Sequence, residues 1–193
     1  GETLASASSD KMLMFWDVKS RKEIEDLIDH EECVRSVAFS PDGKTLASAS
    51  DSKTVNIWDV ASRQIVKTLP VSRQGIVDIT FSGDGTYLAC ACLEGTYIFE
   101  TADWGRRTTV RSEDQFFTVA FHPDRPIVAV PSSRSDRVQL WDVAANREVA
   151  SLEHPGGPHS VPFAPDRLQT LHLGLLRFWV SSIELQGLRF ALV

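Results

Sequence analysis

The chain has 193 residues, 42% of them hydrophobic, and a formal net charge of −6, which is the composition of a folded domain with a core. Acidic and basic residues are interspersed, so no basic stripe is available to neutralise phosphates, and we expect no nucleic acid partner. No apolar run is long enough to span a bilayer, and the first residues lack the basic and apolar regions of a signal peptide, so we expect no membrane association.

One eleven-residue pattern occurs four times, over residues 33–43, 75–85, 115–125 and 157–167. A second marker, Trp followed by Asp, keeps the same interval, and it degenerates in the third and fifth units. The repeat units end near Trp16, Trp58, Phe99, Trp141 and Trp179. A period of about 40 residues with Trp-Asp at the end of each unit is typical of a β-propeller blade.

Each unit is expected to contain four short strands separated by turns. In the second unit we expect these strands at about 33–39, 45–50, 54–59 and 64–69. The apolar residues Val34, Val37 and Phe39 change from a three-residue to a two-residue spacing, which predicts a β-bulge near the start of the first strand. Ser40 to Gly43 then form a tight turn, because Pro41 presets φ and Gly43 accepts the left-handed conformation.

We expect one domain over residues 1–193, with about four and a half blades of four-stranded antiparallel sheets. The first residues match the middle of a repeat, so we expect the chain to begin partway through a blade. We therefore expect an open arc or a fragment of a larger ring. Counting strands places the fourth strand of blade five at about 186–190, within an atypical tail at 180–193. Blade one then lacks its first strand, and the open edges favour self-association.

These motifs resemble those of the WD-repeat β-propeller family, and the resemblance extends to about residue 180. It implies a ring that typically has seven blades. It also implies a buried hydrogen-bonded set in each blade: a His before the first strand, a Ser or Thr in the second, an Asp before the third, and the Trp. No blade has the complete set. The matching positions are Ser6, Asp10, Trp16, His30, Ser48, Trp58, Trp141, His154, Thr170 and Trp179.

No set of residues indicates catalysis or metal binding. The serines recur at equivalent positions, which a structural role predicts, and no histidines or cysteines have the spacing of zinc ligands. We therefore expect no catalytic residues, no cofactor and no metal. The three cysteines lack Cys-x-x-Cys spacing and are expected to be reduced, which favours a cytoplasmic location.

The tryptophans at the ends of the units recur at one equivalent position, so we expect them to pack between blades and not to bind a ligand. Trp104 falls in a loop outside this repeat pattern. We expect it to be exposed.

Two functions are open at this point. The resemblance implies a non-enzymatic scaffold for protein–protein interaction, whose partners usually dock on the rim where the first strands begin. The positions on this rim are Cys33, Arg35, Asp51, Val77, Gln115, Phe117, Arg134 and His159. Their mixed composition is that of a modest protein–peptide contact. The alternative is a regulatory or sensor segment of a larger multidomain enzyme, with the kinase, protease or nucleotidase domain outside this chain.

Overall fold

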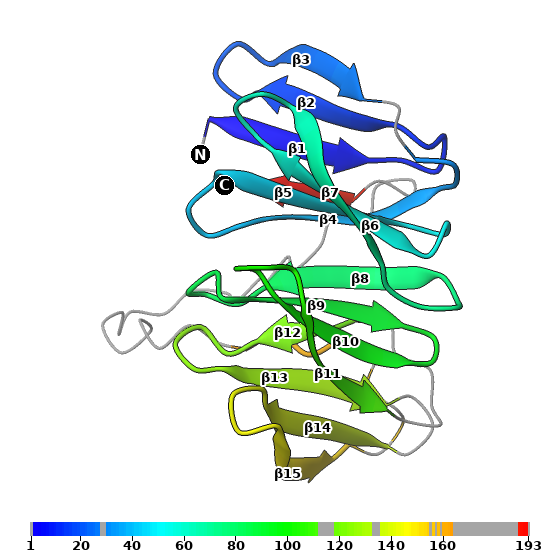
Figure 1. Cartoon of the computed structure of the whole chain (residues 1–193), viewed down its shortest axis with the longest axis vertical. Coiled ribbons are helices and arrows are strands. Elements are labelled where there is room, and N and C mark those ends of the chain that lie inside the picture. Colours follow the sequence, from blue (N-terminus) through cyan, green and yellow to red (C-terminus); the bar gives the residue numbers. More distant parts are fainter. Residues whose placement is uncertain are drawn as a thin grey trace, which may run out of the picture.

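A computed structural model describes residues 2–27, 30–111, 118–132, 136–154, 156, 158, 160–163 and 189–192. Across these ranges the chain forms sixteen strands and no helix, arranged as four separate four-stranded sheets (Figure 1). All strand pairs are antiparallel. The all-β class and the four-stranded blades predicted from the sequence are thus confirmed. Within the described ranges, no helix is long and apolar enough to cross a membrane.

Three of the sheets are continuous in sequence and pair their strands in chain order. Blade two consists of β4 (Val34–Phe39), β5 (Thr45–Ser50), β6 (Thr54–Asp59) and β7 (Gln64–Pro70). Blade three consists of β8 (Ile76–Phe81), β9 (Tyr87–Cys92), β10 (Gly95–Glu100) and β11 (Arg106–Arg111). Blade four consists of β12 (Ala120–Phe121), β13 (Ile127–Ser132), β14 (Arg137–Asp142) and β15 (Arg147–Glu153).

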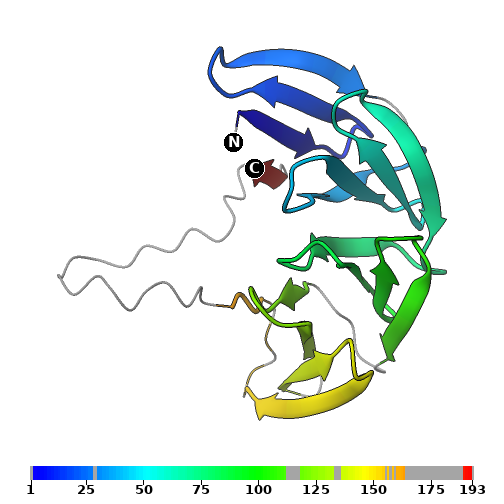
Figure 2. The ribbon, with the colours of Figure 1, turned by 60° about the vertical axis from the view of Figure 1, so that its left-hand side comes forward.

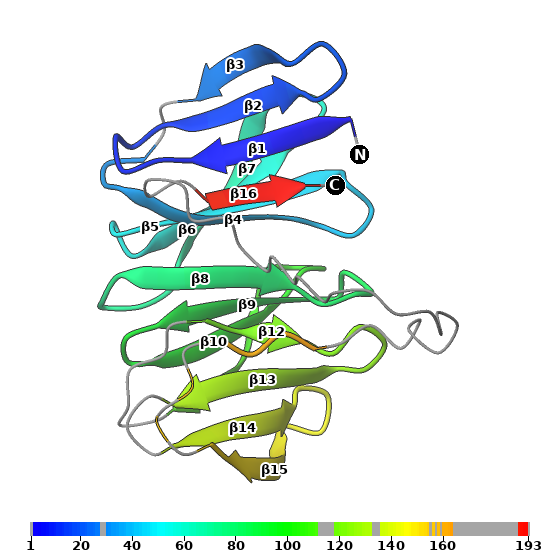
Figure 3. The ribbon, with the colours of Figure 1, turned by 180° about the vertical axis from the view of Figure 1, so that it is seen from behind.

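Blade one draws its strands from both ends of the sequence. It consists of β16 (Arg189–Leu192), β1 (Thr3–Ala7), β2 (Leu13–Asp17) and β3 (Lys22–Leu27). β16 lies beside β1, with Leu4 opposite Leu192 and Ala7 opposite Arg189 (Figure 3). The expectation that blade one lacks its first strand is therefore wrong. The edge of β1 offers unpaired backbone donors and acceptors, and a distant segment satisfies them.

The expected fifth blade falls mostly outside the described residues. Residues 160–163 are described, and they form no strand. The four blades follow one another in an open arc, with β16, β4, β8 and β12 on its inner side and β3, β7, β11 and β15 on its outer side (Figure 2). Along the inner side, β16 contacts β4, β4 contacts β8, and β8 contacts β12.

The hydrophobic core lies between neighbouring blades. Strands of blades two and three bury both faces, because their apolar residues alternate toward the preceding and the following blade. Trp58 faces blade one and packs with Phe15, whereas Ile57 faces blade three and packs with Ile79 and Leu88. Trp58 is 1% exposed. Full burial of a large apolar side chain contributes roughly 1.5–3 kcal/mol to stability. The apolar interfaces between successive blades therefore hold the arc together.

One carboxylate links three blades on the inner side. Ser36 Oγ on β4 donates a hydrogen bond to Asp78 Oδ1 on β8 at 2.9 Å. The backbone N–H of Val119, which precedes β12, lies 3.3 Å from Asp78 Oδ2. Hydrogen bonds to an ionised acceptor are stronger than neutral ones. Asp78 therefore fixes the positions of the first strands of blades two, three and four.

Candidate functional site

The first strands of blades two and three carry a bulge at the same position. The pairing of β4 with β5 shifts register between Val34 and Ser36, which leaves Arg35 as the extra residue. The pairing of β8 with β9 shifts between Ile76 and Asp78, which leaves Val77. The bulge predicted near the start of the first strand is confirmed. A bulge redirects its side chain, and Arg35 is exposed while Val77 is half-buried.

Arg35 and Asp51, both predicted rim residues, are bonded to each other. The Nε atom of Arg35 lies 3.0 Å from Oδ1 and 2.9 Å from Oδ2 of Asp51, and Nη2 lies 2.6 Å from Oδ2. The hydrogen bond with Asp51 raises the pKa of Arg35 above its ordinary value, so the guanidinium stays charged. The side chains are 53% and 33% exposed, and a pair of this kind adds only about 0–1 kcal/mol to stability.

The bulge residues lie among neighbouring blades. A Cβ atom on Gly75 of blade three would come within 3.0 Å of Asp51 Oδ1, so the absence of a side chain lets this carboxylate approach the next blade. Cys33 Sγ donates to the carbonyl oxygen of Ser9 of blade one at 3.1 Å. We name Ser9, Cys33, Arg35, Asp51, Gly75 and Val77 the first-strand face. The remaining predicted rim residues, Gln115, Phe117, Arg134 and His159, lie outside the described residues.

Blade two contains the hydrogen-bonded set that the resemblance implies, without its Asp. The Nε1–H of Trp58 donates to Ser48 Oγ at 2.8 Å, and His30 Nε2 lies 2.6 Å from the same oxygen. All three residues are buried. The arrangement joins the segment before β4 to β5 and β6, so its role is structural.

In blade one the Nε1–H of Trp16 donates to Ser6 Oγ at 2.8 Å, as in blade two. The placement of Asp10 in this set is wrong. Asp10 is exposed, and its Oδ1 accepts the backbone N–H of Met12 at 3.1 Å. The carboxylate closes the turn before β2, since an Asp side chain readily bonds the backbone two residues further on.

Blade three has Cys90 at the position of Ser48, opposite Tyr97 in the register of β9 and β10. Burial raises the pKa of Cys90 well above its usual value and raises that of Cys92 to about 12. Both side chains are therefore thiols at neutral pH. All three cysteines of the chain are free. Cys90 and Cys92 act as small apolar residues in the interface with blade two.

The predicted hydrogen bond of Trp141 in blade four is absent. Its indole Nε1 is buried without a partner in the described residues. The register explains the difference, because Val130 stands on β13 where Ser48 stands on β5. A valine side chain offers no acceptor.

This pairing gives a stability prediction. Val130→Thr adds a hydroxyl next to the unpaired indole N–H, so we expect the free energy of unfolding to stay within about 0.5 kcal/mol of wild type or to rise by about 1 kcal/mol. Val128 is equally buried on the same face of β13. The hydroxyl of Val128→Thr would be buried without accepting the indole N–H of Trp141. This variant should lower the free energy of unfolding by about 1–3 kcal/mol. Urea denaturation of both variants compares them directly, and an equal loss would contradict the assignment.

His154 does not occupy the position of His30. Its backbone N–H bonds to Asp136 O at 2.6 Å, as that of Val71 bonds to Lys53 O at 3.1 Å. His154 is thus equivalent to Val71, which comes one residue before the position that corresponds to His30 in its repeat. The side chain of His154 is exposed. The placement of His154 predicted from the sequence spacing was wrong by one residue. Thr170 and Trp179, the other members predicted for blade five, lie outside the described residues.

Trp104, expected to be exposed and outside the repeat, belongs to it and is half-buried. It lies four residues after Glu100 and has a φ of 60°. The equivalent turns of the other blades have Arg21, Arg63 and Asn146 at this position, with φ between 51° and 58°. For a residue other than glycine this conformation costs roughly 1 kcal/mol. The sequence did contain a signal for this turn, because each of these residues lies four positions after the end of the Trp-Asp marker.

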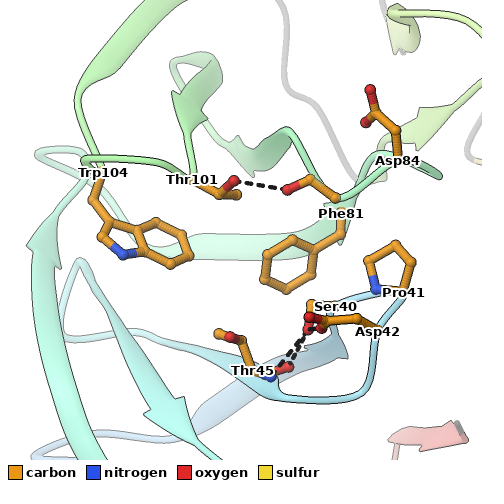
Figure 4. A pocket seen from close by; sticks show the side chains of 9 residues that line it. Ser40, Pro41, Asp42, Thr45, Phe81, Asp84, Thr101 and Trp104 are labelled. Atoms are coloured by element: carbon orange, nitrogen blue, oxygen red, sulfur yellow. Dashed lines mark hydrogen bonds between the residues drawn. The ribbon is translucent and has the colours of Figure 1, made fainter.

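A pocket of about 460 Å³ lies beside Trp104, between blades two and three. Phe81 and Trp104 of blade three face Ser40 and Pro41 of blade two across it (Figure 4). The two rings meet edge to face, 6.5 Å apart at 74°. The pocket is lined by turns that follow the first strands, whereas the first-strand face lies where those strands begin. Among the described residues, no group of three or more His, Cys, Asp or Glu could hold a metal ion.

Comparison with known families finds the WD domain, G-beta repeat, at residues 21–59 and 63–98. Each match begins in the turn before the outer strand of one blade and ends in the third strand of the next blade. The repeat is thus offset by one strand from the blade. A search of characterised proteins finds no significant match. Repeats of this type generally mediate protein–protein interaction. The chain thus contains WD repeats over residues 21–59 and 63–98, and its succession of four-stranded antiparallel sheets agrees with the blades that such repeats form.

Proposed function

We propose that this chain is a non-enzymatic scaffold that binds protein partners through the first-strand face. The observation that supports it is the pairing of Arg35 with Asp51 on an exposed bulge. Arginine is enriched among the residues that dominate interfaces, and ordering a mobile side chain costs binding energy. Asp51 already holds this guanidinium in place, so that cost is reduced.

The composition of the surface supports the same function. The first-strand face combines a charged pair, the thiol of Cys33 and the apolar Val77, drawn from neighbouring blades. Contact sites for peptides have this mixture of polar and apolar groups. The net charge of −6 and the interspersed charges also favour protein over nucleic acid as the partner.

Peptides selected from a random display library on the full chain would test this proposal. We expect Arg35→Ala to lower the affinity for the selected peptides by about tenfold. Truncation of a central interface arginine commonly costs more than 1 kcal/mol of binding free energy. The melting temperature should hardly change, since the ion pair is exposed. Lys67→Ala, on the outer strand β7, is the matched control and should leave binding intact. Selected peptides that bind Arg35→Ala and wild type equally would contradict the use of this face.

A further inference from the structure

The pocket beside Trp104 is built by an aromatic residue at a position that is polar in the other three blades. Trp104 replaces the Arg or Asn of the equivalent turns and keeps their left-handed backbone. The left-handed backbone is thus common to this turn in all four blades, and the aromatic side chain is what distinguishes blade three. The indole lies beside the pocket and packs against Phe81 instead of pointing into solvent (Figure 4).

The opposite wall of the pocket comes from the turn after β4. Pro41 and Asp42 line it, and the carboxylate of Asp42 lies next to Ser40 (Figure 4). Gly85 keeps the space open, because any side chain there would require a φ of 74° and would contact Pro41. With about 460 Å³, the pocket has room for one long side chain and the backbone that carries it.

The charge of the pocket has one sign. Of the residues that the structure describes, two carboxylates line it, Asp42 and Asp84, and no lysine or arginine does, although Lys44 acts on Asp42 from outside the lining. The hydroxyl of Ser40 donates to Asp42, and that of Ser82 donates to Asp84, each at 2.6 Å. These hydrogen bonds lower the pKa of both carboxyl groups, so both are charged at neutral pH. A cation is the complementary ligand.

We propose that this pocket binds an arginine side chain of a partner protein, with the guanidinium over the indole of Trp104 and paired with Asp42. A guanidinium is planar, stacks on aromatic faces and bonds carboxylates through two N–H groups. The pocket presents an indole from blade three and a carboxylate from blade two, so both kinds of partner for a guanidinium line it. The pocket lies away from the first-strand face, so it would be a second contact site, and its existence does not depend on the use of Arg35.

Nuclear magnetic resonance of the full chain can test this site. Each tryptophan indole N–H gives one signal, and the signal lost in Trp104→Asn identifies Trp104. Asn146 occupies the equivalent turn with a φ of 51°, so asparagine preserves the backbone there. The probe is the capped peptide Gly-Gly-Arg-Gly-Gly. We expect it to shift the Trp104 signal with a Kd of about 1 mM or below.

The controls separate an arginine site from a general response to charge. The same peptide with citrulline, which is neutral and isosteric, should bind at least about fivefold more weakly, and so should the arginine peptide to Asp42→Asn. Binding to Trp104→Asn is followed through the backbone amide signals of Gly85 and Thr101, which line the pocket, and should be weakened by a similar factor. Asp59 accepts bonds from Ser62 in a similar turn of blade two and does not line the pocket. Asp59→Asn therefore removes the same charge and should leave binding unchanged.

Three results would overturn the proposal: no shift of the Trp104 signal, equal affinity for the citrulline peptide, or equal affinity for a lysine peptide. Binding that is lost in Arg35→Ala but not in Trp104→Asn would overturn it too, while leaving the proposed scaffold function intact. If the arginine peptide no longer bound Trp104→Asn but still bound Arg35→Ala, and the selected peptides still required Arg35, both sites would be supported.

Discussion

Replacing His30 with alanine is expected to lower the free energy of unfolding by about 1–3 kcal/mol. His30 is 6% exposed, and its Nε2 lies 2.6 Å from Ser48 Oγ, which also accepts the indole N–H of Trp58. Alanine leaves the serine hydroxyl in a buried site with one partner fewer, and it leaves a gap beside β5. Urea denaturation followed by tryptophan fluorescence would measure the loss.

His122 provides the comparison for His30. It is half-buried in the turn between β12 and β13, where its Nδ1 accepts the backbone N–H of Asp124 at 3.1 Å. Water can replace this bond, so His122→Ala should change the free energy of unfolding by no more than about 0.5 kcal/mol. Equal losses in the two variants would mean that the set around Ser48 does not stabilise blade two.

Gly83→Ala is expected to destabilise the junction of blades three and four by about 1–3 kcal/mol. A Cβ atom at position 83 would clash with the backbone carbonyl oxygen of Pro123 in the neighbouring hairpin turn. Blade two has Pro41 at the equivalent position, so the sequence of the turn itself does not require glycine. The close approach of the next blade does, because a backbone carbonyl can move only if the hairpin moves.

Gly75→Ala is the matched control. Its added Cβ would meet the side-chain oxygen of Asp51 at 3.0 Å, and a side chain can rotate away. Gly75→Ala should therefore be close to neutral, since alanine also restricts the unfolded chain and so offsets part of any strain. Thermal unfolding of the two variants distinguishes them. If Gly83→Ala were as stable as Gly75→Ala, blades three and four would have to lie further apart.

The repeats predicted the blades because their spacing directly reflects local structure. The bulge at Arg35 followed from a change in apolar spacing, and the hairpin turns followed from Pro41 and Gly43. The pairing of β16 with β1 could not be predicted in this way, since strand counting follows chain order and a distant strand has no local marker. The count instead assigned residues 186–190 to another blade.

The candidate sites were predicted only where the register of each blade was clear. The hydrogen bond between Trp58 and Ser48 matches the family pattern. Trp141 lacks the same bond because Val130, which has no acceptor, takes the place of Ser48. The pairing of Arg35 with Asp51 was not foreseen, since it depends on the bulge that turns Arg35 toward the end of β5. The pocket at Trp104 was missed because the turn before the fourth strand was treated as irregular.

The place of β16 in blade one also has a consequence for synthesis on the ribosome. β1 is made well before β16, so blade one has an open inner edge while the residues between these two strands are translated. Contacts between residues far apart in sequence form slowly, because a long segment must be closed before they are gained. Blades two and three, whose strands are consecutive, can form during translation, but blade one can be completed only after residues 189–192 have left the exit tunnel.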